Sequence, residues 1–420
     1  MSAPATTTTV TKKKRFQMFE ALGHRDYRLF WLGSLASVMG FQMLMLTQGW
    51  LMYDLTGSKL QLGLIGLASA APSILLNLFG GVVADKVDQR KLIMATQLTA
   101  GLIVVALGVL TLAGSLQPWH LMVSALLMGG VGAFDMPSRQ AIFPYLVDRG
   151  SMMNAVALNS MIWQGTRIVG PALGGVIISY AGPASTFLIA SAGFMVFVAL
   201  LAVVHVPRVE RSGSGRMIKE MGEGLSYVRD NPVFAFLLGM TFFNSFFGMS
   251  YITLMPVFQK DILLVDEKGL GLLLGVGGAG AFVGTFAVAS VGKKLPKGWL
   301  IIGGGLAFGA AIVAFGVSHW FLLSLGLAFL AGLASSVYMI AVQGTLQMLV
   351  PDRFRGRVMG FWGMAYNLMP LGGFQAGVVA NYMGAPIAVG VGGALVMAFA
   401  LLGAARNARV RSLGAAEHSQ

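Results

Sequence analysis

Long apolar runs separated by short polar breaks follow one another along most of the chain. The runs are continuous rather than alternating, which predicts helices and not the strands of a barrel. Each is long enough to cross ~30 Å of hydrocarbon as a helix. They cover roughly residues 29–53, 60–84, 91–114, 119–145, 154–180, 184–206, 233–258, 268–291, 298–318, 320–348, 356–382 and 386–405. The pattern predicts an all-α membrane protein with twelve transmembrane helices in two halves of six.

The polar stretches divide the chain into five predicted parts. These are an N-terminal tail at 1–28, a six-helix bundle at 29–206, a linker at 207–232, a second bundle at 233–405 and a tail at 406–420. The first tail has no apolar core, so we expect no cleavable signal. In the linker, Met217, Met221, Leu225 and Val228 recur at helical spacing among charged residues. This spacing predicts an amphipathic helix, which either lies on the inner membrane face or covers the linker from the solvent side.

Composition and charge support this interpretation. Hydrophobic residues make up 56% of the chain and charged residues only 11%, which excludes a soluble globule of this size. Of the 29 Lys and Arg residues, 24 fall in the tails, the linker and the loops that follow even-numbered helices. Such an asymmetry predicts that both termini are cytoplasmic, and it explains the net charge of +13 without a nucleic-acid partner. Cysteine is absent, so no disulfide or thiol chemistry is expected.

Two short motifs recur between the halves. LVDR at 146–149 is echoed by LVPDR at 349–353, and YAGP at 180–183 is echoed by YMGAP at 382–386. The offsets, 203 and 202 residues, nearly agree. An internal repeat of six helices is typical of transporters with two parallel halves, whose substrate site lies between the halves near the midplane.

The segment at 80–91, GGVVADKVDQRK, resembles the signature loop of the major facilitator superfamily. The matching positions are Gly81, Asp85, Lys86, Arg90 and Lys91, whereas Asp88 and Gln89 replace the usual glycine and base. The resemblance implies a cytoplasmic loop between the second and third helices. It also implies that Asp85 engages the start of helix eleven near Arg355, where a helix N-terminus carries partial positive charge. An ordinary positively charged turn is the alternative.

Residues 129–175 and 349–360 resemble the enterobactin-exporter branch of that superfamily. The first contains D-x-P-x-R-Q-A, N-A-x-A-L-N-S and R-x-x-G-P-A-L-G-G; the second reads LVPDRFRGRVMG. The resemblance implies a monomeric secondary transporter of the bacterial inner membrane that exports a small organic molecule, siderophore-like or drug-like, with protons as the coupling ion. It also implies a second gate at Arg353, Arg355 and Arg357. An importer or uniporter of the same fold, or a membrane scaffold or sensor, are the alternatives.

Gly170, Pro171, Gly174 and Gly175 resemble the antiporter motif of the superfamily. Small residues at four-residue spacing allow a second helix to approach closely, and Pro171 allows a bend. The motif therefore has either a packing role or a direct role in alternating access. The arginine motif usual in helix four is missing, since the sequence there is SALLMGG.

Three charged residues fall inside predicted helices, where charge is costly and therefore informative. Asp135 and Arg139 are spaced for an ion pair on one helix, and Asp135 lies ~24 Å from the outer start of helix four. We expect Asp135 to form a gate with Arg139 or with a base of the 86–91 loop; a proton-carrying role is the alternative. Arg167 lies ~20 Å deep from the other side with no acid at matching depth. It either binds an anionic group of a substrate or donates to carbonyl and amide oxygens of a neighbouring helix.

Cavity residues are predicted only from the resemblance, which implies that helices one, four, seven and ten line the cavity. The candidates are Gln42, Gln48, Trp163, Asn244, Tyr251, Tyr338 and Gln343. Enzyme chemistry finds no support, because the five His are scattered and no glycine-rich run reads as a phosphate loop. We therefore expect neither a metal nor a cofactor.

Overall fold

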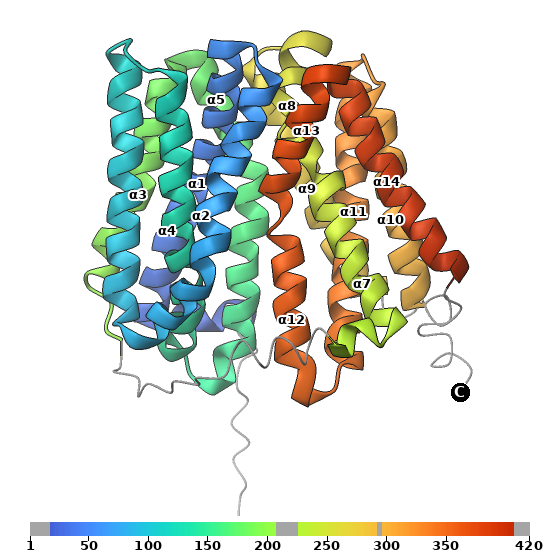
Figure 1. Cartoon of the computed structure of the whole chain (residues 1–420). Coiled ribbons are helices and arrows are strands. Elements are labelled where there is room, and N and C mark those ends of the chain that lie inside the picture. Colours follow the sequence, from blue (N-terminus) through green and yellow to red (C-terminus); the bar gives the residue numbers. More distant parts are fainter. Residues whose placement is uncertain (1–16, 207–225, 292–295, 407–420) are drawn as a thin grey trace, which may run out of the picture.

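The computed structural model describes residues 17–206, 226–291 and 296–406. The side chains of residues 17, 18, 77–82, 84–86, 149, 291 and 352 lie outside this description. The described part is helical and contains no strand. Figure 1 shows two bundles standing side by side, with α1 to α5 in one and α7 to α14 in the other.

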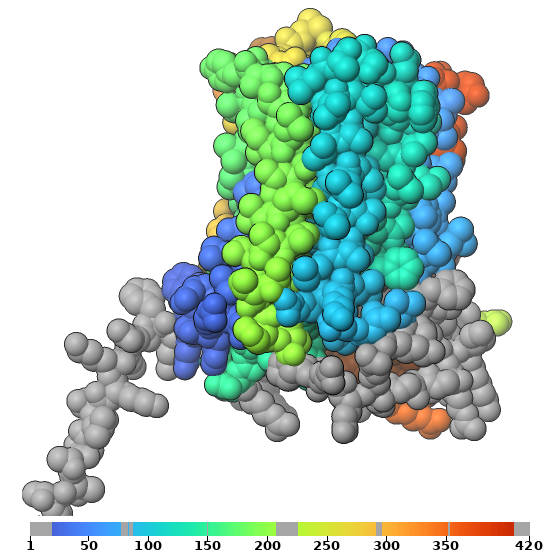
Figure 2. Space-filling view, turned by 90° about the vertical axis from the view of Figure 1, so that its left-hand side faces the viewer, coloured from blue at the N-terminus to red at the C-terminus, as the bar shows by residue number. Residues whose placement is uncertain are grey.

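The first bundle contains six long helical segments. They are α1 (Arg25–Thr56), α2 (Lys59–Lys86), α3 (Gln89–Leu112), α4 (Pro118–Ile142) and the two parts of α5 (Met152–Leu201), with short 3-10 turns η1 (Gln17–Gly23), η2 (Phe143–Leu146) and η3 (Arg149–Ser151). The two parts of α5 are separate helices, because Gly182 has φ 77° and turns the chain back. Figure 2 shows α3 with the second part of α5 on one side and α4 on the other, and η1 at the foot of α5.

The second bundle contains two broken helices. Its elements are α7 (Pro232–Phe243), η4 (Asn244–Gly248), η5 (Met249–Ile252), α8 (Met255–Val257), η6 (Phe258–Ile262), α9 (Glu267–Val291), α10 (Lys297–Gly316), α11 (Phe321–Leu349), α12 (Asp352–Tyr366), α13 (Met369–Met383) and α14 (Ala385–Arg406). The segment from α7 to η6 passes through two π-helical turns, η4 and η6. The predicted continuous helix at 356–382 is wrong: it is interrupted at Asn367 and Leu368, two residues before Pro370, whose ring and missing N–H prevent the helix from continuing.

Twelve membrane-crossing segments result when each broken segment is counted once. Ten described helices are long and apolar enough to span a membrane by themselves. One of these, α5, holds two crossings, and α12 and α13 are each too short alone at 15 residues. The predicted fold, an all-α protein of the twelve-helix type, is confirmed.

Four tight turns with glycine at positive φ gather at one end of the molecule, at the top of Figure 1. They are Gly57, Gly114, Gly182 and Gly384, with φ from 59° to 91°, a region that side chains with a Cβ rarely adopt. We refer to this end as the Gly57 end. The opposite end carries the starts of α1, α3 and α12 (Figure 1).

The two bundles meet along two seams of glycine. In one seam α2 packs on α13, and an added Cβ at Gly66 would lie 2.4 Å from the carbonyl oxygen of Pro370. In the other, the first part of α5 packs on α9, and a Cβ at Gly175 would lie 2.4 Å from the carbonyl oxygen of Glu267. Backbones approach this closely only where side chains are absent.

Candidate functional site

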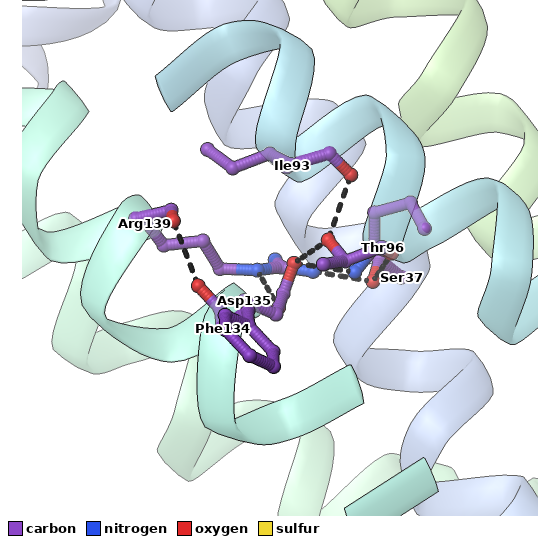
Figure 3. Close-up of polar contacts among 8 residues, drawn as sticks. Ser37, Ile93, Thr96, Phe134, Asp135 and Arg139 are labelled. Atoms are coloured by element: carbon purple, nitrogen blue, oxygen red, sulfur yellow. Dashed lines mark hydrogen bonds and ion pairs between the residues drawn. The ribbon is translucent and has the colours of Figure 1, made fainter. Parts of the chain in front are cut away.

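The carboxylate of Asp135 is the centre of a buried polar network (Figure 3). Asp135 lies on α4 and is 7% exposed. Its Oδ1 accepts hydrogen bonds of 2.8 Å from the Thr96 hydroxyl and from the Gln97 side-chain amide, both on α3. Its Oδ2 accepts from Nε of Arg139 at 2.6 Å, one helical turn further along α4. The spacing of four residues places the acid N-terminal to the base, the favourable order on a helix.

Arg139 closes the network into a ring. Its Nη2 donates to the Ser37 hydroxyl on α1 at 2.8 Å, and that hydroxyl donates in turn to Oε1 of Gln97 at 2.6 Å. The guanidinium also lies over the Phe197 ring, 4.5 Å from its centroid, on the second part of α5. One ion pair therefore ties together four transmembrane segments of the first bundle.

The network is a charge pair whose balance depends on one proton. Burying a lone charge in a bundle is expensive, so each partner requires the other. Protonation of Asp135 would leave Arg139 uncompensated among Ser37, Phe197 and α4. Ser37, Thr96 and Gln97 are not among the predicted site residues. Their signal in the sequence is a polar side chain inside an apolar helix, but which helices face each other is fixed only by the fold.

The side chain of Arg167 stands at the boundary between the bundles. It is half-buried on the first part of α5, and it makes no hydrogen bond or ion pair with another described residue. Its charge interacts with the hydroxyl of Tyr251 in η5 of the second bundle. Its backbone carbonyl would lie 2.8 Å from a Cβ at Gly278 on α9. Arg167 thus lies at the seam between the bundles, and its charge has no acidic partner in the described part of the chain.

The described part of the signature-like loop caps helix ends. Arg90 donates to the carbonyls of Leu201, at 2.9 Å, and Ala202, which lie at the C-terminal end of α5. The Leu201 carbonyl also accepts from the backbone N–H of Val204 at 3.2 Å. Asp88, which replaces the usual glycine, is the N-cap of α3 and accepts from the backbone N–H of Lys91 at 3.2 Å. The departure from the family pattern therefore has a local structural reason.

The remaining gate candidates are only partly described. The structure does not describe the side chains at positions Gly81, Asp85 and Lys86. The engagement of Asp85 with α12 therefore stays a prediction. On α12, the guanidinium carbons of Arg353 and Arg357 lie 5.2 and 5.6 Å from the centroid of the Phe354 ring. Arg355 lies between them on the same helix.

The antiporter-like motif packs in two directions. A Cβ at Gly170 would lie 2.6 Å from Cβ of Gln42, and one at Gly174 would lie 2.7 Å from Cδ2 of Leu46, both on α1. Gly175 instead faces α9 across the seam. The carbonyl of Pro171 faces α9 as well, because a Cβ added at Gly271 would lie 2.6 Å from its oxygen. The motif therefore joins α5 both to its own bundle and to the other one.

Four of the predicted cavity residues are buried in this structure, and their place in a substrate cavity stays a prediction. Gln48 is 3% exposed and donates to the Leu121 carbonyl and the Ser124 hydroxyl within the first bundle. Asn244, Tyr251 and Tyr338 are equally buried, at 5% exposure or less. Polar side chains inside membrane helices can form hydrogen bonds with neighbouring helices as well as line a cavity. The position of a residue in the sequence does not distinguish these two roles. Gln42, Trp163 and Gln343 are half-buried.

Polar contacts join the bundles at the Gly57 end. Lys260 in η6 forms an ion pair of 2.7 Å with Asp54 at the end of α1, and the Tyr53 hydroxyl donates to Asp261. Lys268 on α9 lies over the ring of Tyr180, 4.1 Å from its centroid. Further along the seam, the Gln164 amide donates to the Thr285 hydroxyl at 3.2 Å.

A family model described as transmembrane secretion effector matches residues 17–419, almost the whole chain. The chain belongs to this branch of the major facilitator superfamily. Among curated relatives, the staphyloferrin A transporter of Staphylococcus aureus is 25% identical over 338 residues, which are 80% of this chain and 84% of the relative. The multidrug efflux pump Tap of Mycolicibacterium fortuitum is also 25% identical, with the same coverage. The enterobactin exporter EntS of Escherichia coli is 23% identical over 84% of this chain and 86% of its own length.

Solved structures show the same fold. A bacterial homologue of the human lysosomal transporter Spinster, inward-facing and occupied, superposes with a TM-score of 0.74 at 16% identity, covering 92% of this chain and 98% of that one. A variant of the nucleoside transporter NupG superposes with a TM-score of 0.73 at 13% identity, covering 91% of this chain and 99% of that one. This member of the superfamily is thus a multi-pass bacterial membrane transporter that acts on small molecules, and not an enzyme.

Proposed function

We propose that this transporter exports a small organic molecule with an anionic group, siderophore-like in chemistry, from the cytoplasm in exchange for protons. The observation that carries the proposal is Arg167: a half-buried guanidinium at the seam between the bundles, with no acidic partner among the described residues. Such a charge is costly unless something compensates it, and a substrate anion that arrives and leaves would do so. A guanidinium holds carboxylate or catecholate oxygens in a bidentate manner.

The relatives favour the same substrate class. Two of them carry the names of siderophore transport proteins, and one of those is an exporter. A drug-like substrate is the second candidate, favoured by the efflux pump among the relatives. Asp135 is the candidate proton carrier, because it is the buried acid whose protonation would release Arg139. Import or uniport by the same fold would need the same anion site, but no exchange of substrate for protons.

Uptake into inverted vesicles tests the proposal. We expect an acid-inside pH gradient to drive accumulation of catecholate or citrate-type siderophores, and a protonophore to abolish it. Arg167→Gln should lower uptake of the anionic substrate at least tenfold and leave an uncharged analogue of the same size unchanged. Arg167→Lys should fall between, because it keeps the charge and loses the planar fork. The matched control is Arg406→Gln at the end of α14, which should transport normally.

Two outcomes would contradict the proposal. Equal losses for both substrates, together with poor expression of Arg167→Gln, would assign Arg167 a role in holding helices together. Uptake that is indifferent to the gradient would replace exchange by uniport.

A further inference from the structure

A small pocket opens beside the Asp135 network, on the side of the bundle opposite the Gly57 end. Its walls come from the early part of α1, the late part of α4 and the early part of α5. Phe30, Val38 and Ile162 supply apolar surface and Trp163 an indole ring, whereas Gln140 and Asn159 supply amides. The pocket is therefore amphipathic, because Ser34 and Arg139 add further polar groups to its lining.

Two buried polar atoms in this pocket have no partner among the described residues. One is Nη1 of Arg139, the nitrogen that the network leaves over after Nε bonds Asp135 and Nη2 bonds Ser37. The other is the hydroxyl of Ser34, on a residue that is 3% exposed. Unsatisfied buried donors cost stability, and natural proteins retain few of them. Both residues line the same pocket.

We propose that this pocket binds an uncharged oxygen acceptor, such as an amide or ketone carbonyl, on an aromatic ligand. The donors come from Nη1 of Arg139 and the Ser34 hydroxyl, and the ring packs on Trp163 and Phe30. The charge of Arg139 is already matched by Asp135 at 2.6 Å, so a second anion would add a negative charge close to that carboxylate. A neutral acceptor takes the free N–H groups without that repulsion. The inference rests on the proposed function in that the ligand is part of the transported molecule, separate from the anionic group assigned to Arg167.

Equilibrium binding to the purified full-length protein tests the pocket without any gradient. Three tritiated probes of one shape are compared: 1-naphthylacetamide, 1-naphthylacetate and 1-ethylnaphthalene. We expect the amide to bind at least fivefold more tightly than either of the others. Ser34→Ala should weaken amide binding roughly threefold to tenfold and leave the hydrocarbon unchanged, the effect of one lost hydrogen bond. Arg139→Lys should weaken it further, if the variant elutes as a folded monodisperse protein.

Ser185→Ala is the matched control. Its hydroxyl donates to the Ala181 carbonyl across the turn between the two parts of α5, and it does not line the pocket. Tighter binding of the acetate than of the amide, an amide affinity that Ser34→Ala does not change, or no saturable binding of any probe would each overturn the proposal. A wild-type protein that binds the amide as expected but moves no substrate in vesicles would contradict the proposed function and support the pocket. Gradient-driven transport without amide binding would support the proposed function and contradict the pocket.

Discussion

At the scale of single residues, Asp135 and Arg139 hold each other in place. Asp135 accepts hydrogen bonds from three side chains, and Arg139 returns two of its three nitrogens to the same ring. Because both side chains are about nine-tenths buried, water does not screen the pair as it would at a surface. Breaking one partner of such a pair leaves an uncompensated charge, whereas removing both leaves only a packing defect.

Asp135→Asn should therefore destabilise the protein by about 3 kcal/mol, the order found for broken buried pairs. An amide keeps the shape but loses the charge, and its N–H₂ group would face a donor of Arg139. The double variant Asp135→Asn with Arg139→Leu should recover part of the loss. Thermal unfolding in detergent, followed by size-exclusion chromatography, measures both. Asp148→Asn is the control, because its side chain is 86% exposed and its contact with His24, 3.8 Å long, lies at the surface, so stability should hardly change. An Asp135→Asn variant as stable as wild type would contradict a structural role for the pair.

The sequence identified this pair because a spacing of four residues is visible on one helix. It did not identify Ser37, Thr96 or Gln97, because these come from α1 and α3 and meet Asp135 only through the packing of the bundle. The same limit applies to Gln48 on α1 and Tyr338 on α11, which are buried in the structure. The helix of each was predicted, but the face on which each side chain lies is decided by neighbouring helices.

At the scale of elements, the positions of helices follow from the apolar runs, and their interruptions do not. The break before α13 has a visible cause in Pro370, but Pro72 and Pro137 lie inside the unbroken helices α2 and α4. The π-helical turns η4, with the sequence NSFFG, and η6, with the sequence FQKDI, contain no proline. Proline is thus tolerated where neighbouring helices satisfy the freed carbonyl, which is a property of the fold.

The glycine seam between α2 and α13 gives a prediction at this scale. Gly66→Ala places a methyl group 2.4 Å from the Pro370 carbonyl, a backbone atom that cannot swing away. We expect the two helices to separate at the Gly57 end, and transport to fall because the closed seam no longer forms. Spin labels at Leu55 and Tyr382, both exposed, should show a longer label-to-label distance than in the protein without the substitution, measured by pulsed electron paramagnetic resonance. Gly132→Ala on α4 is the control, because nothing lies within 4 Å of the added methyl. Unchanged distances in Gly66→Ala would show that the seam adapts without opening.

At the scale of the whole molecule, the direction of insertion sets the meaning of every site. The basic residues predict that the Gly57 end is outside, and nothing in the fold alone distinguishes its two ends. Absence of cysteine makes the test direct. A single cysteine at Ser115, next to the turn at Gly114, should react with an impermeant thiol reagent added to intact cells. One at Asp230, at the opposite end and exposed, should react only after permeabilisation. The reverse pattern would refute the orientation.

The bundles are also linked by polar contacts at the Gly57 end, and we expect these contacts to favour the conformation that is closed at that end. The ion pair of Lys260 with Asp54 is nearly half exposed on both sides, so it contributes at most about 1 kcal/mol. A bias of that size changes the ratio of two conformations roughly fivefold, which is enough to alter a transport cycle without threatening the fold. The contact is therefore suited to break and form again in each cycle, unlike the buried pair at Asp135.

Asp54→Lys should turn this attraction into repulsion and raise the population open at the Gly57 end several-fold. Spin labels at Leu55 and Leu264, both exposed, report the separation as a distribution of distances. The charge swap, Asp54→Lys with Lys260→Asp, restores the attraction with the signs exchanged and should return the distribution to that of wild type. Raising the salt concentration should shrink the difference between the single variant and wild type, because an exposed pair is screened. A swap that behaves like the single variant would show that the side chains act through packing at this end, and that the charge pair sets no bias between the two conformations.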